Sequence, residues 1–109
     1  MFESVLFAYD SSQVSATERS KIEAVAQHLK QNPAVAVIVE GHSDERGSRE
    51  YNLALGERRA LAVRSYLSGL GIEVERIQTK SMGEEKPASL EHNDSAWSQN
   101  RRGEFILYY

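Results

Sequence analysis

The stretch from Ser48 to Ser68 holds the residues whose types and spacing suggest chemistry. At about 100° per residue, one helical face collects nine side chains: Asn52, Leu55, Gly56, Arg59, Ala60, Val63, Tyr66, Leu67 and Leu70. Most of this stripe is apolar, so we expect it to face a core, whereas the adjacent Arg58 points off the stripe into solvent. Asn52 and Arg59 are its polar members. A buried guanidinium needs a partner, because an unpaired buried charge costs several kcal/mol. Asp44, just after the preceding apolar run, is the nearest carboxylate along the chain.

Two interpretations of Asp44 and Arg59 remain open from the pattern alone. In the first, they form a structural ion pair that joins a loop to the helix. In the second, both line the mouth of a pocket that receives a zwitterion, since a carboxylate binds an ammonium and a planar guanidinium binds a carboxylate in a fork. A helix N-terminus near Ser48 would add exposed N–H groups and a partial positive charge. The second interpretation predicts recognition of an amino acid.

Catalytic and metal-binding arrangements find little support in the sequence. His42, Ser43 and Asp44 are triad residue types, but consecutive residues of an extended segment point to alternate sides and cannot form a relay. None of the histidines stands at a metal-ligand spacing from another, and no phosphate-binding glycine motif is present. The chain has no cysteine, which removes disulfides and thiolate chemistry. We therefore expect a protein that is not an enzyme and has no cofactor and no metal.

Length and composition limit the function further. A chain of 109 residues with 40% hydrophobic and 27% charged residues predicts a single folded domain over 1–109. The net charge of −3 argues against nucleic acid, whose phosphates require a basic excess. No apolar run approaches the roughly 18 residues of a membrane span, and Met1–Glu3 does not begin a signal peptide. We expect the chain to be a domain from a longer protein.

Periodicity and turn residues predict the elements that must position these side chains. Ser15 with Glu18 has the spacing of a capping box that starts the first helix, and Asn32-Pro33 ends that helix. The second helix follows Ser48 and is ended by Gly69 and Gly71. Strands are expected at Val5–Ala8, Val35–Val39, Ile77–Met82 and Phe105–Tyr109, the second of them buried on both faces.

The order of these elements predicts the fold class. Strand, helix, strand, helix, strand, loop, strand (β-α-β-α-β-loop-β) indicates an α/β (α+β) two-layer sandwich: a four-stranded mixed sheet with two long helices on one face. The loop is the irregular stretch from Gly83 to Gln99, which we expect Trp97 to pin down. Asn100-Arg101-Arg102 reads as a solvated run before the last strand, with one arginine beside the pocket as the alternative.

The sequence resembles the OmpA-like C-terminal peptidoglycan-binding domain over about Val5 to Tyr108, and within it the peptidoglycan-associated lipoprotein branch. The resemblance rests on one long motif in two parts: Glu40-Gly41-His42-Ser43-Asp44-Glu45-Arg46-Gly47 and Glu50-Tyr51-Asn52-Leu53-Ala54-Leu55-Gly56-Glu57-Arg58-Arg59-Ala60. Supporting matches are Phe7-Ala8-Tyr9-Asp10, Gly83-Glu84-Glu85-Lys86-Pro87 and Asn100-Arg101-Arg102.

The resemblance implies non-catalytic binding to the stem peptide of peptidoglycan, with meso-diaminopimelate as the anchor. In that family the aspartate of the Gly-His-x-Asp segment and the arginine before the alanine hold the diaminopimelate. These positions correspond to Asp44 and Arg59, and the asparagine of the Tyr-Asn step corresponds to Asn52. Tyr9 and Asp10 look like a further pocket wall, and Arg46 like a loop contact.

The resemblance also implies a location and partners. Such a domain lies in the periplasm and tethers the outer membrane to the cell wall. No lipid-bearing cysteine is present in these 109 residues, so any membrane anchor is expected to precede Met1. The alternative function is a protein-interaction module that binds a periplasmic β-propeller Tol protein, for which residues 83–99 offer a polar surface. A wall hydrolase is disfavoured, because no nucleophile, metal site or paired acid and base is apparent.

Overall fold

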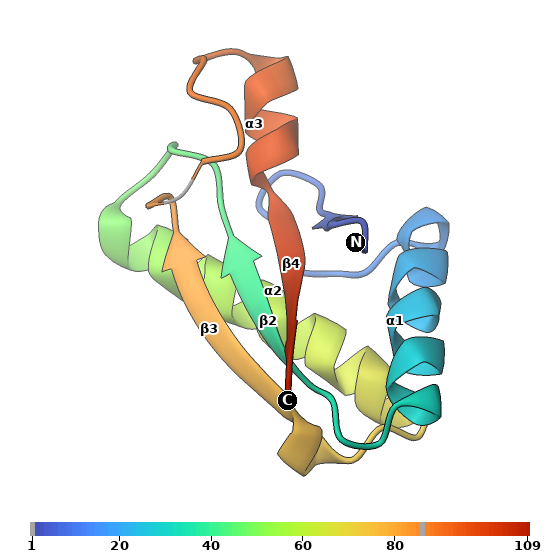
Figure 1. Ribbon diagram of the computed structural model, residues 1–109. Coiled ribbons are helices and arrows are strands. Elements are labelled where there is room, and N and C mark those ends of the chain that lie inside the picture. The colour runs from blue at the N-terminus through green and yellow to red at the C-terminus, as the bar shows by residue number, and fades with distance from the viewer. Residues whose placement is uncertain (1, 86) are drawn as a thin grey trace.

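The strands form one four-stranded sheet in the order β1-β4-β2-β3 (Figure 1). The computed structural model describes residues 2–85 and 87–109. Its elements are β1 (Val5–Leu6), the 3-10 turn η1 (Ala16–Glu18), α1 (Arg19–Gln31), β2 (Ala36–His42), α2 (Arg49–Gly69), the 3-10 turn η2 (Val74–Arg76), β3 (Ile77–Gly83), α3 (Asp94–Asn100) and β4 (Arg102–Tyr108).

The sheet is mixed, as predicted. β2 and β3 are parallel, while β4 lies antiparallel to both β2 and β1. The long helices α1 and α2 lie on the same face of the sheet (Figure 1). The core between the helices and the sheet is aliphatic, with Ile22, Val25 and Leu29 from α1, Val37 and Val39 from β2, and Val63 and Leu67 from α2 among its members. The predicted two-layer fold class is therefore confirmed.

Helix α2 approaches the sheet most closely where two glycines meet. A Cβ atom added to Gly41 of β2 would overlap the carbonyl oxygen of Gly56, and one added to Gly56 would collide with the Ser81 hydroxyl. Because neither glycine carries a side chain, the α2 backbone lies directly against β2 and β3. This contact fixes the register between the N-terminal half of α2 and the end of β2, where the candidate site lies.

Helix α2 matches its prediction. Ser48 is its N-cap, and the Ser48 hydroxyl accepts a hydrogen bond from the Tyr51 amide at 3.1 Å. The helix ends at Gly69, and Gly71 beyond it has φ +98°, a left-handed conformation that suits glycine. Arg58 is exposed, as expected from its place off the stripe.

Other predicted boundaries are wrong. The first strand covers only Val5–Leu6, and the last begins three residues early, at Arg102. The predicted capping box does not form, because the Ser15 hydroxyl caps no amide and the Glu18 carboxylate instead accepts from the Leu6 amide at 2.8 Å. A 3-10 turn therefore precedes α1.

Two further expectations about the sheet and its loop are also corrected. The central strand is not fully buried on both faces, since Ile38 is only partly covered. The stretch expected to be irregular contains α3, whose N-cap Asn93 accepts from the Ala96 amide at 2.9 Å. In residues 2–85 and 87–109, no helix combines the length and the hydropathy needed to cross a bilayer.

Candidate functional site

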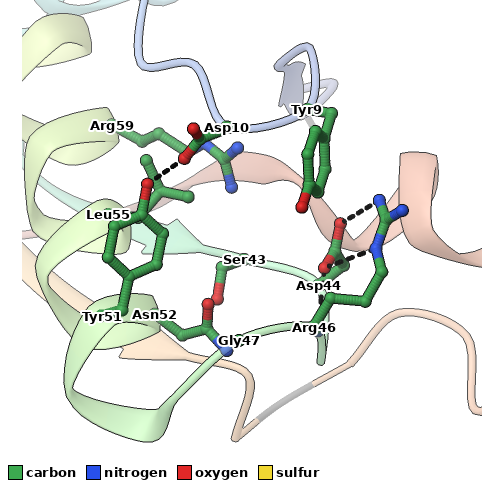
Figure 2. A pocket seen from close by; sticks show the side chains of 10 residues that line it. All are labelled: Tyr9, Asp10, Ser43, Asp44, Arg46, Gly47, Tyr51, Asn52, Leu55 and Arg59. Carbon is green, nitrogen blue, oxygen red and sulfur yellow. Dashed lines mark hydrogen bonds and ion pairs between the residues drawn. The ribbon is translucent and has the colours of Figure 1, made fainter.

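A small pocket of about 60 Å³ lies between α2, the end of β2 and the segment after β1. Figure 2 shows side chains from these three segments converging on it. The pocket is lined by Tyr9, Asp10, Ser43, Asp44, Arg46, Gly47, Tyr51, Asn52, Leu55 and Arg59. All six residues selected from the sequence are among these, so the fold brings together positions up to fifty residues apart.

Arg59 is fully buried and binds backbone carbonyl groups. Its Nε donates to the Ser11 carbonyl at 2.8 Å, Nη1 to the His42 carbonyl at 2.9 Å and Nη2 to the Ala8 carbonyl at 3.2 Å. Burial, together with the nearby charge of Arg101, lowers the pKa of Arg59 to about 10, so the side chain stays protonated at neutral pH.

The structural ion pair between Asp44 and Arg59 that one interpretation predicted does not form. Among the described residues no carboxylate lies within 4.0 Å of the Arg59 guanidinium. The buried charge is compensated by carbonyl dipoles instead, and Arg59 thereby ties the segment after β1 to the end of β2. Both Asp44 and Arg59 line the pocket.

Asp44 is buried, and its carboxylate contacts two arginine side chains. Arg46 donates from Nη2 to Asp44 Oδ2 at 2.9 Å and from Nε to Oδ1 at 3.3 Å, and its backbone amide donates to Oδ1 at 3.0 Å. Arg101 Nη1 lies 3.5 Å from Oδ2. Burial raises the pKa of Asp44, but the hydrogen bonds from Arg46 outweigh burial and hold that pKa below its usual range.

Arg46 is held between two aromatic rings. Its guanidinium carbon lies 4.2 Å from the centre of the Tyr9 ring and 4.0 Å from that of Trp97. Sequence reasoning gave Trp97 only the role of pinning its loop. The structure places Trp97, in α3, against the same arginine that binds Asp44, a contact across 51 positions that no local pattern reveals.

Two residues at the start of α2 complete the wall. The Tyr51 hydroxyl donates to Asp10, and the Asn52 amide donates to the Glu84 carboxylate at 2.9 Å. Tyr51 was not selected from the sequence, although it sits beside Asn52 within the motif. Asn52 is buried, whereas Tyr51 and Asp10 are exposed at the pocket rim.

The arginines after α3 are not the solvated run that the sequence suggested. Asn100 is buried and its side chain accepts from the Ala88 and Ser89 amides, while Arg102 is also buried. Arg101 donates from Nε to the Phe7 carbonyl at 2.8 Å and reaches Asp44. The alternative prediction, that one arginine lies beside the pocket, fits Arg101.

The pocket combines both signs of charge in a small space. Asp10 and Asp44 supply carboxylates, and Arg46 and Arg59 supply guanidinium groups. Such a set can bind a molecule that carries an ammonium and a carboxylate a few bonds apart. The described lining residues include no histidine and no cysteine.

Comparison with known proteins gives a consistent picture. The sequence matches the OmpA family over residues 6–101. It is 46% identical over 108 residues to the peptidoglycan-associated lipoprotein of Haemophilus influenzae, covering 99% of this chain and 69% of that protein. It is also 46% identical over 101 residues to the protein of the same name from Legionella pneumophila, covering 93% of this chain and 57% of that protein.

The fold has solved counterparts. The crystal structure of the peptidoglycan-associated lipoprotein from Burkholderia pseudomallei superposes with a TM-score of 0.93 at 42% identity, covering 96% of this chain and 89% of that chain. The C-terminal domain of MotB from Helicobacter pylori has a TM-score of 0.91 at 19% identity, covering 100% of this chain and 86% of that chain, a likeness of fold alone.

Proposed function

This chain belongs to the OmpA family, and from that premise we propose that it binds peptidoglycan in the periplasm and tethers the outer membrane to the cell wall. The family consists of binding domains and not of enzymes. Two relatives matched at 46% identity are named peptidoglycan-associated lipoproteins, and the chain spans 57% to 69% of their length. The proposal treats residues 1–109 as one peptidoglycan-binding domain.

The proposed ligand is the meso-diaminopimelate of the stem peptide. Its distal end carries an ammonium and a carboxylate on one carbon atom, so it needs one acidic and one guanidinium partner close together. The observation that carries the proposal is the pocket in which Asp44 and Arg59 stand together with Asn52, Asp10, Tyr9 and Arg46.

Arg59 is proposed to bind the ligand carboxylate. A guanidinium has five N–H donors, and the three bonds to backbone carbonyls leave two for a ligand. Because those three bonds already fix the side chain, binding costs little side-chain entropy. The first turn of α2, which follows Gly47 at the pocket wall, adds positive potential on the same side.

Asp44 is proposed to bind the ligand ammonium. It already accepts from Arg46 at three positions and from Arg101 at a longer distance of 3.5 Å. Since a carboxylate offers about four lone-pair sites, the ammonium must replace one of these contacts, and the Arg101 contact is the weakest. Asp10 at the rim supplies a second carboxylate that is open to solvent.

Sedimentation with purified sacculi tests this function. Asp44→Asn removes the charge with little change of shape, and we expect it to abolish co-sedimentation. Glu75→Gln, in an exposed position of η2, is the matched control and should bind like wild type. If Asp44→Asn is folded by circular dichroism and still sediments like wild type, the assigned site is wrong.

The alternative function is a protein-interaction module for a Tol-type β-propeller, with peptidoglycan secondary. The observation in its favour is the segment before α3, which exposes Leu90 to 81%. A pull-down of such a partner that competing muropeptide does not reduce, together with sacculus binding unaffected by Asp44→Asn, would favour this alternative.

A further inference from the structure

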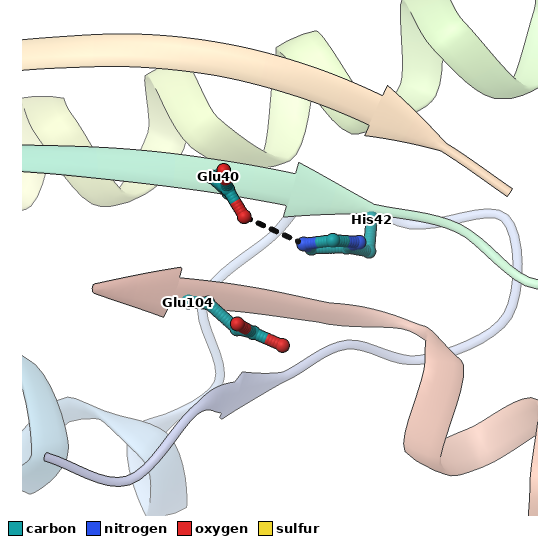
Figure 3. Close-up of side chains that lie close together, drawn as sticks. All are labelled: Glu40, His42 and Glu104. Atoms are coloured by element: carbon teal, nitrogen blue, oxygen red, sulfur yellow. Dashed lines mark ion pairs between the residues drawn. The ribbon is translucent and has the colours of Figure 1, made fainter. Parts of the chain in front are cut away.

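A second polar cluster lies on the face of the sheet opposite the helices. Glu40 and His42 are two residues apart on β2 and so point to the same side, and Glu104 stands opposite Glu40 in the register of β4. Figure 3 shows the Glu40 and His42 side chains directed toward each other, with the Glu104 side chain on the neighbouring strand β4. One ligand atom from each lies within 4.8 Å of the other two.

His42 supplies the buried imidazole of the cluster. Its exposed fraction is 1%, and neither ring nitrogen has a hydrogen-bond partner among the described residues. The nearest charged atom is Glu40 Oε1, 3.5 Å from Nε2. Buried polar atoms are nearly always satisfied, so these nitrogens call for an explanation.

Glu40 is a second buried member of the cluster. It is 7% exposed, and within 4.0 Å of its carboxylate the described part of the chain offers only the His42 ring as a charged partner. Lys80 is its register partner on β3, but that lysine is exposed and makes no ion pair with Glu40 in residues 2–85 and 87–109. A buried carboxylate in this position favours a bound cation.

Glu104 can serve two partners at once. Its Oε2 accepts from Arg102 Nε, which leaves Oε1 as a potential ligand atom. Carboxylates that bind metals are commonly hydrogen-bonded by outer-shell groups, as Glu104 is by Arg102. The Glu104 side chain is 36% exposed, so solvent has access to the cluster from this side.

We propose that Glu40, His42 and Glu104 form a binding site for a divalent transition metal of the Zn²⁺ type, separate from the proposed peptidoglycan pocket. One imidazole nitrogen and two carboxylate oxygens suit Zn²⁺ and its neighbours, whereas Mg²⁺ and Ca²⁺ prefer oxygen ligands only. Three atoms within 4.8 Å of one another lie no more than about 2.8 Å from a common centre. Zn–ligand bonds of about 2.0–2.2 Å therefore require side-chain shifts of less than about 1 Å, with water completing the coordination.

Zn²⁺ titration of the untagged 109-residue chain, in competition with a chromophoric chelator, tests the site. His42→Gln should weaken Zn²⁺ binding by more than about tenfold, since even outer-shell partners change metal affinity by 10–100-fold. The control is the double variant His28→Gln/His92→Gln, which removes the other two histidines, including the exposed His92 that contacts Glu45. It should bind one Zn²⁺ like wild type, and Mg²⁺ should not compete.

A second variant covers the case in which His42→Gln does not fold. Glu104→Gln changes a partly exposed side chain, leaves the core intact and should also weaken Zn²⁺ binding by more than about tenfold. The proposal is overturned if binding is lost in the double variant and kept in Glu104→Gln, or if wild type binds no Zn²⁺ at micromolar concentration. Sacculus binding is independent of this result, so the two proposals fail separately.

Discussion

At the scale of single residues, Arg59 joins two segments of backbone, and the proposed function gives it a ligand to bind as well. Three of its donors bind carbonyl groups from the segment after β1 and from the end of β2. The planar fork of arginine makes this possible, and lysine cannot reproduce it.

Arg59→Lys should therefore destabilise the protein although it keeps the charge. Carbonyl groups left without donors in a buried position predict a loss of about 2–4 kcal/mol in the free energy of unfolding. Arg58→Lys, at the exposed neighbouring position, should change it by less than about 0.5 kcal/mol. Urea denaturation of both variants checks this, and equal stabilities would contradict the anchoring role of Arg59.

The Asp44–Arg46 pair makes a second prediction at this scale. Because Arg46 lowers the pKa of Asp44 while burial raises it, Arg46→Ala should raise the pKa of Asp44 above its wild-type value. NMR titration of the side-chain carboxyl carbon measures this. Arg49→Ala, whose arginine pairs with Glu85 instead, should leave the pKa of Asp44 unchanged. A pKa of Asp44 that is the same in both variants would show that Arg46 does not stabilise the ionised form.

The same pair predicts how stability depends on pH. The pKa of Asp44 is lower in the folded than in the unfolded protein. The ionised carboxylate therefore contributes its full share to the free energy of unfolding above the unfolded pKa of about 3.9, and this share is lost as the pH falls toward the folded pKa. Wild type should exceed Asp44→Asn in free energy of unfolding at pH 7, and this difference should shrink at pH 3. Denaturation curves at the two pH values give the answer, and a difference that grows in acid would contradict the assigned sign.

At the scale of elements, the position of α2 depends on the contact between Gly41 and Gly56. Backbone lies against backbone here, so a methyl group added at Gly56 would meet no flexible neighbour except the Ser81 hydroxyl. The same contact positions Arg59, one turn further along α2, at the end of β2.

Gly56→Ala should destabilise the protein by about 1–3 kcal/mol or more, as overpacking does in a rigid core, despite the higher helix propensity of alanine. Gly69→Ala, in the last turn of the same helix, meets nothing within 4 Å and should be neutral or slightly stabilising. Thermal denaturation compares the two variants. Equal melting temperatures would mean that α2 does not depend on this close approach.

Elements with strong local signals could be predicted, and contacts between distant elements could not. The stripe of α2 and its Ser48 cap are local patterns, and both agree with the structure. Helix α3 is only seven residues long and too short for a periodic signal, so the stretch around Trp97 was expected to be irregular. The capping-box pattern at Ser15 and Glu18 failed because the Leu6 amide, from outside the helix, takes the Glu18 carboxylate.

In the candidate site too, positions with a local sequence signal could be predicted and contacts between distant segments could not. The polar positions Asn52 and Arg59 follow from helix geometry, and the family motif adds Tyr9, Asp10 and Arg46, all of which line the pocket. One of the two interpretations paired Arg59 with Asp44, and neither identified its carbonyl partners, because backbone carbonyls occur at every residue and leave no sequence signal. The Glu40–His42–Glu104 cluster was missed because it forms across two strands that are 60 residues apart in sequence.

At the scale of the whole molecule, the sheet separates two polar regions. The helix-covered side carries the core and, at the end of β2, the mixed-charge pocket (Figure 2), while the opposite side carries the Glu40–His42–Glu104 cluster (Figure 3). Strand β2 contributes to both, since the His42 carbonyl accepts from Arg59 while its ring lies in the cluster. In the proposed function as a tether, the central strand would supply a rigid frame behind the pocket.

The central claim is that the pocket binds meso-diaminopimelate through Asp44 and Arg59. Its most direct test is a heteronuclear NMR titration with free meso-diaminopimelate, with Nα-acetyl-L-lysine amide as the control ligand, because this blocked lysine has the side-chain ammonium but no free carboxylate. We predict shifts with diaminopimelate alone, at the amides of Asp44, Ser48 and Arg59, and none of these shifts in Asp44→Asn. Equal shifts with both ligands, or shifts confined to residues outside the pocket, would contradict the claim.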